Sequence, residues 1–332
     1  MEIKKRPIGS INQIENLSGS YHKKKASLGT RIKNELYKNR YLYLLTIPVL
    51  LYYLIFCYVP MAGIVIAFKQ FDIGKGVGGI FTSNWVGLKY FREFFNSINF
   101  YKLIRNTFLI SFYDLLFGFP MPIIFALLLN EIKGKYFKKT IQTVTYLPHF
   151  ISLVVMCGII ADFFSSDGIM TKLFVLFGGT QKNHLGDAAL FRGIYVGTNI
   201  WQGFGWGSII YLAALTGINP DLYEAANVDG ANRFKQLLII TLPGIAPTII
   251  IMLILRMGQL MGVGFEKIIL LYGPSTYETG DVIASFVYRR GLGASAQYSF
   301  SAAVGLFQSI INLILLVVAN FLGSKYSSTS LM

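Results

Sequence analysis

The stretch YLYLLTIPVLLYYLIFCYVPMAGIVI, residues 41–66, decides the fold class of this chain of 332 residues. It contains no charged side chain, and a helix needs about 20 predominantly apolar residues to cross the hydrocarbon core of a bilayer. The segment before this apolar run is too long and polar for a cleavable signal peptide, and no small-residue cleavage site follows the run. We therefore expect residues 41–66 to remain in the protein as a membrane-spanning helix.

The composition of the whole chain also indicates a lipid environment. Hydrophobic residues make up 54% and charged residues 14%, whereas a soluble domain carries about 25% charged residues. The net charge of +14 would fit a nucleic-acid-binding protein. However, ten of the 30 Lys and Arg residues lie in the first 40 positions, just before the apolar run. Such a basic arm is retained on the cytoplasmic side, so nucleic acid is not an expected partner.

Five further apolar runs follow the first one, and they cover about residues 106–129, 143–164, 194–215, 245–265 and 301–322. Backbone groups in lipid must be hydrogen-bonded within the structure, which leaves helices or closed barrels. No run alternates like a barrel strand. The sequence predicts an all-α integral membrane protein with six transmembrane helices, in which residues 1–40 form a basic cytoplasmic arm and residues 41–332 form the transmembrane domain.

The basic loops predict the orientation in the membrane. Six spans place both termini on the same side. The segment 131–140 carries four lysines, Lys133, Lys135, Lys138 and Lys139, and short cytoplasmic loops are enriched in Lys and Arg. We expect a multi-pass protein of the bacterial cytoplasmic membrane with both termini in the cytoplasm.

The pattern needed for bond chemistry is missing from the sequence. The three histidines, His22, His149 and His184, are far apart and lack metal-ligand spacing. No GxxxxGK[ST] loop for nucleotide phosphates is present. A membrane-embedded enzyme would need a cluster of His, Asp or Glu, which the sequence does not suggest. We expect no catalytic residue, no metal site and no cofactor bound by this chain.

A second informative stretch, NPDLYEAANVDGANRFKQLLIITLPGIAP, covers residues 219–247 between the fourth and fifth runs. Asn219 can cap a helix, and Pro220 suits the first helical turn. Asp229 and Gly230 are predicted to end this helix, because glycine adopts a positive φ without steric cost. The stretch therefore predicts a short helix that ends in a sharp turn.

A second helix is predicted to begin near Asn232 and to run to about Thr241. Pro243 and Pro247 are expected to mark the entry to the fifth span. The result is a helix hairpin on the cytoplasmic face between spans four and five. The small side chains of Ala225 and Ala226 are expected to let another protein approach one side of this hairpin closely.

Seven positions in this stretch resemble the EAA loop of binding-protein-dependent ABC importer permeases. They match that loop without a mismatch across 20 residues, at Glu224, Ala225, Ala226, Gly230, Ile240, Leu242 and Pro243. Over about residues 40–325, the chain is also similar to the carbohydrate-uptake subfamily. The residues that carry this second resemblance are Asn106-Thr107, Tyr146-Leu147-Pro148-His149 and Gly264-Phe265-Glu266.

The resemblance implies that the transmembrane domain is a permease and that its EAA loop, about 219–247, couples it to a separate ATPase. It implies four kinds of partner: a second homologous permease, an ATP-binding cassette ATPase dimer that binds ATP and Mg²⁺, an extracellular solute-binding protein, and the bilayer. Transport would follow alternating access. The residues that it assigns to ATPase coupling are Glu224, Ala225, Ala226, Asp229, Gly230, Ile240, Leu242 and Pro243.

Polar and aromatic residues in or near spans four and five are candidates for the transport path. Aromatic rings stack on sugar rings and amides hydrogen-bond to hydroxyl groups, while intramembrane charges usually face protein or water. The candidates are Asn199, Trp201, Gln202, Trp206, Arg256, Gln259 and Glu266. The same residues could equally be core aromatics or members of structural ion pairs, with Asp114 as a further intramembrane charge, so the sequence leaves both roles open.

The function that the resemblance implies is a permease subunit of an ATP-driven importer, with an oligosaccharide or glycan fragment as cargo. A permease for a peptide or another polar solute is one alternative. A passive membrane channel is another, although a channel would need neither the hairpin nor ATP.

Overall fold

The computed structural model describes residue 29, residues 37–293 and residues 296–326. Most of the predicted basic arm therefore lies outside the described residues. The chain forms two compact units, residues 1–63 and residues 64–332. Helices make up most of the described residues, which also contain one sheet of two short strands.

The first predicted span is confirmed as a helix that is long and apolar enough to cross a membrane, from Arg40 to Phe68. Its segments are α2 (Arg40–Tyr53), the π-helical turn η3 (Leu54–Tyr58), α3 (Val59–Met61) and the 3₁₀ helix η4 (Ala62–Phe68). None of the residues in α2, η3 or α3 is buried within the chain. A helix that is apolar on all sides fits a lipid surrounding.

A folded loop connects the first two spans. It contains β1 (Lys69–Gln70), the 3₁₀ helix η5 (Ile73–Gly78), α4 (Gly79–Thr82), β2 (Asn84–Trp85) and α5 (Lys89–Phe95). The strands pair antiparallel with Lys69 opposite Trp85. The Lys69 ammonium donates to the backbone carbonyls of Ile80 and Phe81 at 2.9 and 2.8 Å, which fixes α4 to the strand pair.

The second predicted span is confirmed within a helix of 32 residues from Phe100 to Glu131. Its segments are α6 (Phe100–Tyr113), the π-helical turn η6 (Asp114–Gly118) and α7 (Pro120–Glu131).

The third predicted span, 143–164, is not one straight helix. The structure has α8 (Lys135–Tyr146), the 3₁₀ helix η7 (Leu147–Phe150) and α9 (Leu153–Phe163), with a bend of 102° before α9. Ile151 is extended, with ψ at 134°. Ser152 then caps α9, its hydroxyl accepting from the Val155 N–H at 3.4 Å. This bent pair counts as a crossing only if its two members are taken as one span.

The fourth predicted span lies within α11 (Ala188–Thr216), which follows α10 (Ile169–Leu176). At 1.5 Å per residue its 29 residues extend for about 43 Å. That length is sufficient to span a bilayer, but amide and glycine residues lower the hydropathy of α11. It is consequently not one of the four helices in the described part of the chain that are both long and apolar enough to cross.

The fifth predicted span begins earlier and ends earlier than expected. After α12 (Asp221–Val228), a continuous helix of 25 residues consists of α13 (Arg233–Gln236), the π-helical turn η8 (Leu237–Thr241) and α14 (Leu242–Met257). The predicted end of the second hairpin helix near Thr241 is therefore wrong, because this helix continues through Pro243 into α14. The predicted end near residue 265 is also wrong, because the glycine-rich segment 258–264 follows Met257 and is not helical.

Three of the apolar helices continue through a proline by means of a π-helical turn. These turns are Leu54–Tyr58 before Pro60, Asp114–Gly118 before Pro120, and Leu237–Thr241 before Pro243. A proline ring clashes with the carbonyl four residues earlier in a regular α-helix, and in each case that carbonyl lies in the π turn. The wider turn relieves the conflict and lets the helix continue.

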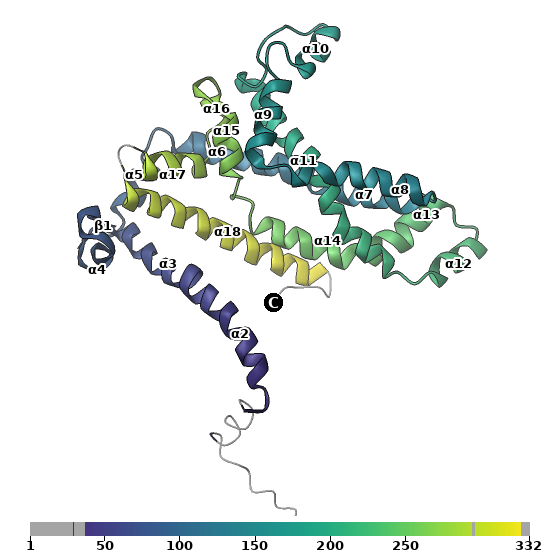
Figure 1. Cartoon of the computed structure of the whole chain (residues 1–332), viewed down its shortest axis with the longest axis horizontal. Helices are drawn as coiled ribbons and strands as arrows, with labels where there is room; N and C mark the ends of the chain where they lie inside the picture. Colours follow the sequence, from purple (N-terminus) through teal and green to yellow (C-terminus); the bar gives the residue numbers. More distant parts are fainter. Residues whose placement is uncertain (1–28, 30–36, 294–295, 327–332) are drawn as a thin grey trace, which may run out of the picture. The chain divides into compact units, whose positions relative to one another are not determined.

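The C-terminal part contains α15 (Phe265–Leu271), the 3₁₀ helix η9 (Pro274–Thr276), α16 (Tyr277–Gly280), α17 (Ile283–Leu292) and α18 (Tyr298–Tyr326). The sixth predicted span is confirmed within α18. In Figure 1, α18 lies beside α14 and α17. The three described apolar cores lie between α9, α11 and α15, between α5, α6, α17 and α18, and between α7, α11 and α14. Helix α11 contributes to two of them and is central to the unit.

Gly205 allows α11 to cross the α8 backbone at very short range. A Cβ atom at Gly205 would lie 2.2 Å from the carbonyl oxygen of Thr145, whereas a Cβ atom at Gly203 would meet nothing within 4 Å. We expect Gly205→Ala to destabilise the protein by about 1–3 kcal/mol, because a backbone group would have to move. Gly203→Ala in the same helix should be neutral or slightly stabilising. Thermal unfolding of the purified membrane complex measures both, and equal melting temperatures would contradict the close crossing.

Candidate functional site

The hairpin between α12 and α13 turns at Gly230, which has a φ of +73°. The predicted positive φ at Gly230 is therefore confirmed. The N–H of Ala231 donates to the carbonyl of Ala226 at 2.9 Å and the N–H of Gly230 donates to that of Asn227 at 3.1 Å. This arrangement satisfies the last carbonyls of α12, as in helices that end in a left-handed residue. The predicted start of the second helix near Asn232 is confirmed, and Asn232 caps α13 by accepting from the Lys235 N–H at 2.9 Å.

Polar contacts inside the hairpin fix its two helices to each other. The buried Gln236 amide donates to Asn227 Oδ1 at 2.6 Å and to the carbonyl of Ala231 at 2.9 Å. The hydroxyls of Tyr223 and Thr241 lie 3.0 Å apart. Sequence reasoning missed Gln236, whose only local signal was a neutral amide at the start of an apolar run.

The hairpin exposes apolar side chains at its surface. Val228 is 89% exposed and Phe234 is 68% exposed. Of the residues that the sequence assigned to coupling, Glu224, Ala225, Asp229, Gly230 and Pro243 are exposed, Ile240 and Leu242 are half-buried, and Ala226 is buried. The small side chain of Ala226 thus packs within the hairpin rather than on its outer surface. An exposed apolar tip beside acidic groups is suited to contact with another protein.

A polar cavity of about 410 Å³ lies between α6, α11 and the segment that joins α14 to α15. Five residues predicted for the transport path line it: Asn199, Gln202, Arg256, Gln259 and Glu266. The other two predicted residues do not. Trp201 lines a separate apolar cavity of about 660 Å³, and Trp206 stacks on the His149 ring with centroids 4.8 Å apart.

An ion pair between Asp114 and Arg256 lies at the wall of this cavity. Asp114 is buried in the π-helical turn η6, and Arg256 lies in the last turn of α14. The pairing offsets part of the cost of placing each charge away from water. A second cavity of about 530 Å³ shares four lining residues with the first, Asp114, Asn199, Arg256 and Gln259. The ion pair and its two amide neighbours therefore line both the polar cavity and the second, more apolar one.

The Asn199 amide connects this ion pair to a second cation. Its Oδ1 accepts from the Lys267 ammonium at 2.8 Å, and its Nδ2 lies 3.5 Å from Asp114 Oδ1. Lys267 lies at the start of α15 and is 4% exposed, and its ammonium lies 5.3 Å from the centre of the Tyr195 ring. Sequence reasoning missed Lys267, because a lysine beside a glutamate after an apolar run resembles an interfacial pair.

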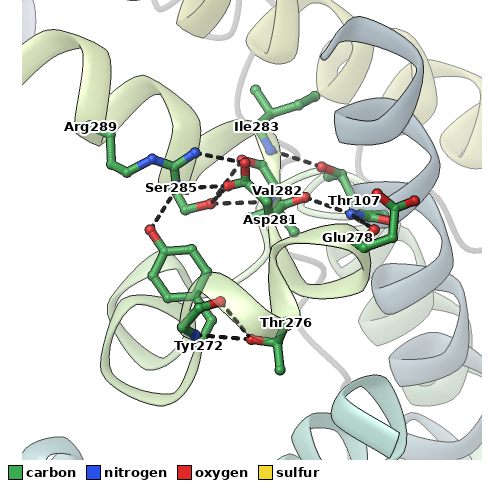
Figure 2. Close-up of polar contacts among 11 residues, drawn as sticks. Thr107, Tyr272, Thr276, Glu278, Asp281, Val282, Ile283, Ser285 and Arg289 are labelled. Carbon is green, nitrogen blue, oxygen red and sulfur yellow. Dashed lines mark hydrogen bonds and ion pairs between the residues drawn. The ribbon is translucent and has the colours of Figure 1, made fainter. Parts of the chain in front are cut away.

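A buried polar network fixes the 272–292 segment to α6 and α11. Figure 2 shows Arg289 and Ser285 meeting the carboxylate of Asp281. The Arg289 guanidinium donates to Oδ1 and Oδ2 of that carboxylate at 2.9 and 2.6 Å, and Ser285 donates to Oδ1 at 2.7 Å. Asn106 in α6 donates to the Asp281 carbonyl at 2.9 Å and accepts from Arg192 in α11 at 2.7 Å. The carboxylate and the neighbouring Tyr272 hydroxyl hold the pKa of Arg289 above its ordinary value, despite partial desolvation.

The chain matches a family model described as the binding-protein-dependent transport system inner membrane component, over residues 100–328. Two similar proteins come from Bacillus subtilis (strain 168). Protein LplB is 43% identical over 295 residues, which cover 89% of this chain and 92% of that protein. The polygalacturonan/rhamnogalacturonan transport system permease protein YteP is 42% identical over 297 residues, which cover 89% of this chain and 91% of that protein.

Two solved structures are also similar. One is a crystal structure of a bacterial ABC transporter involved in the import of the acidic polysaccharide alginate. Its matching chain is 42% identical with a TM-score of 0.81, and the match covers 89% of this chain and 99% of that chain. The other is a bacterial alginate ABC transporter in complex with an alginate pentasaccharide-bound periplasmic protein. There the identity is 41%, the TM-score is 0.82, and the match covers 91% of this chain and 100% of that chain.

Proposed function

Because the chain belongs to the family of binding-protein-dependent transport system inner membrane components, we propose that it is the permease subunit of an ATP-driven importer for an oligosaccharide or glycan fragment. One observation supports an oligosaccharide as the cargo. The chain is similar to a polygalacturonan/rhamnogalacturonan permease and to a chain of an alginate importer, at 42% identity over 89% of this chain in both cases. A peptide permease or a passive channel has no comparable support.

The permease has six spans in this proposal. Four apolar helices are long enough to cross, and the bent pair α8–α9 adds a fifth. We assign the sixth to α11, whose Asn199 and Gln202 amides line the polar cavity and would not contact lipid there. A span that lines a water-filled path can carry more polar residues than one surrounded by lipid.

The hairpin of α12 and α13 is the proposed contact with a separate ATPase that binds ATP and Mg²⁺. Its exposed apolar tip and the exposed Glu224, Ala225 and Asp229 support this role. In Figure 1, α8, α12 and α13 lie at one end of the unit of residues 64–332, away from α5 and α17. Helix α8 carries exposed lysines at that end. Because basic loops are cytoplasmic, we assign this end and both termini to the cytoplasm.

Two further partners complete the proposed importer. A second homologous permease would form the other half of the transport path. A solute-binding protein would deliver cargo at the opposite end from the hairpin, where the Asp281 network fixes α16 and α17 in place. The proposed path residues are Asn199, Gln202, Arg256, Gln259 and Glu266, while a path role for Trp201 and Trp206 stays a prediction.

The test is uptake by the complete importer in proteoliposomes, with ATP supplied on the hairpin side. We expect labelled oligosaccharide to accumulate only with ATP and the binding protein. Glu224→Lys reverses an exposed charge at the proposed ATPase contact and should reduce uptake roughly tenfold, as for loss of one charged contact. Glu93→Lys reverses an exposed charge in α5, at the end away from the hairpin, and as the matched control it should leave co-purification of the ATPase unchanged, whereas Glu224→Lys should reduce it. Uptake without ATP would favour the hypothesis of a passive channel. Uptake of peptides but not of oligosaccharides would show that the cargo is a peptide.

A further inference from the structure

Lys267 is a buried cation that lacks a counter-ion in the described part of the chain. Its side chain lines the 410 Å³ cavity, and the residue is 4% exposed. An ammonium group has three donors. Among the described residues its one hydrogen-bond acceptor is Asn199 Oδ1, and no carboxylate lies within 4.0 Å. Burying a charge without a partner is costly, so a lysine here needs an explanation beyond packing.

The other charges around the cavity leave this requirement unmet. Arg256 and Asp114 neutralise each other. Glu266 lines the same cavity but is exposed, and among the described residues it forms no ion pair. Asn199 and the Tyr195 ring hold the ammonium in place from α11. The result is a fixed cation with free donors at the wall of a cavity whose volume lies within the range of about 300–1,000 Å³ seen for ligand sites.

We propose that Lys267 binds a carboxylate of the cargo during its passage through this cavity, so that the cargo class is an anionic oligosaccharide such as one built from uronic acids. This inference rests on the proposed function. Amides at Asn199, Gln202 and Gln259 would meet the sugar hydroxyls in the same space. The transported polymer named for one similar structure, alginate, is described as acidic, which is consistent with a cation at this position.

The test compares two cargoes of equal length in the complete importer: an oligogalacturonide and the same oligomer with its carboxyl groups reduced to alcohols. We expect Lys267→Gln to reduce uptake of the acidic oligomer about tenfold or more, as for loss of a charged hydrogen bond. Uptake of the reduced oligomer should change little. Lys267→Arg should retain acidic uptake, and Lys172→Gln, which removes an exposed lysine from α10, should behave as native.

The outcomes separate this inference from the proposed function. Equal losses for both oligomers would mean that Lys267 acts only in folding, and no loss would mean that it does not meet the cargo. Uptake of the reduced oligomer alone by the native importer would overturn the anionic class. Each of these leaves oligosaccharide import intact. If neither oligomer accumulates in an ATP-dependent way with native protein, the proposed function itself fails.

The dependence of uptake on pH gives a second measurement. Burial lowers the pKa of Lys267 to about 8, so the ammonium is charged at pH 7 and largely neutral at pH 9. Uptake of the acidic oligomer by native protein should therefore fall across this interval, relative to Lys267→Arg, which stays charged. The variant keeps the other titratable groups near the cavity, Asp114, Cys157, Tyr195, Arg256 and Glu266, so the difference isolates Lys267. Identical pH profiles would overturn the inference.

Discussion

An importer that carries Gly230→Pro should lose ATP-driven uptake by about a hundredfold. Proline fixes φ near −65°, whereas Gly230 has a φ of +73°. Proline also lacks the N–H that donates to the Asn227 carbonyl at 3.1 Å. A local cost of about 3 kcal/mol or more corresponds to roughly a hundredfold change in the population of the correct turn. The exposed tip of the hairpin would then no longer fit the ATPase.

The matched variant is Gly230→Asn, because asparagine tolerates the left-handed region better than other residues with a side chain. A Cβ atom at Gly230 would meet nothing within 4 Å, so the variant tests the backbone alone. We expect it to retain most of the uptake. Co-purification of the ATPase measures docking, and uptake measures transport. If Gly230→Pro keeps both at the native level, the turn plays no part in coupling.

The hairpin could be predicted from the sequence because its signals are local. The helix start near Asn232 and the positive φ at Gly230 depend on residues within one or two helical turns. The burial of Ala226 could not be predicted, because it depends on how α13 folds back against α12. Two alanines that are adjacent in sequence thus have different surroundings, with Ala225 at the surface and Ala226 inside.

The spans were predicted where an apolar run is long and uncharged, and misjudged where the backbone changes direction. Pro243 was expected to interrupt a helix, but a π-helical turn accommodates it. Pro148 was expected inside a span, but the chain bends by 102° shortly after it. Both prolines present the same local signal. Packing against neighbouring helices decides between a widened turn and a bend, and single-residue preferences do not contain that information.

The residues that line the cavities were predicted from the chemistry of their side chains, because the sequence does not show which residues lie close together in the fold. Asn199 and Gln259 were singled out because amides hydrogen-bond to the hydroxyl groups of sugars, and both line the cavities of about 410 and 530 Å³. Trp206 was chosen on the same reasoning but stacks on His149, since an aromatic ring packs equally well against protein. Lys267 reaches Asn199 across 68 positions of sequence, and a contact of that separation is determined by the fold.

Asp281→Asn should destabilise the protein by about 2–3 kcal/mol, because it leaves the charge of the half-buried Arg289 without its counter-ion and weakens charged hydrogen bonds. Asp281 is 3% exposed, and its carboxylate accepts hydrogen bonds from Nη1 and Nη2 of Arg289 and from the Ser285 hydroxyl. Its backbone carbonyl also anchors α6 through Asn106. Thermal unfolding of the purified importer should show the loss, and uptake that depends on the binding protein should fall with it.

Glu278→Gln is the matched control, since Glu278 forms an ion pair with Arg105 at 2.7 Å on the same segment but at an exposed position. Exposed pairs contribute about 0–1 kcal/mol, so this variant should unfold near the native temperature. Adding Arg289→Gln to Asp281→Asn removes the uncompensated charge, and the double variant should recover part of the lost stability. If the melting temperature of Asp281→Asn is no lower than that of Glu278→Gln, the buried Asp281–Arg289 ion pair does not stabilise this end of the protein. The segment of α16 and α17 must then be held mainly by the apolar contacts of Ile283 and Phe286 with α5, α6 and α18.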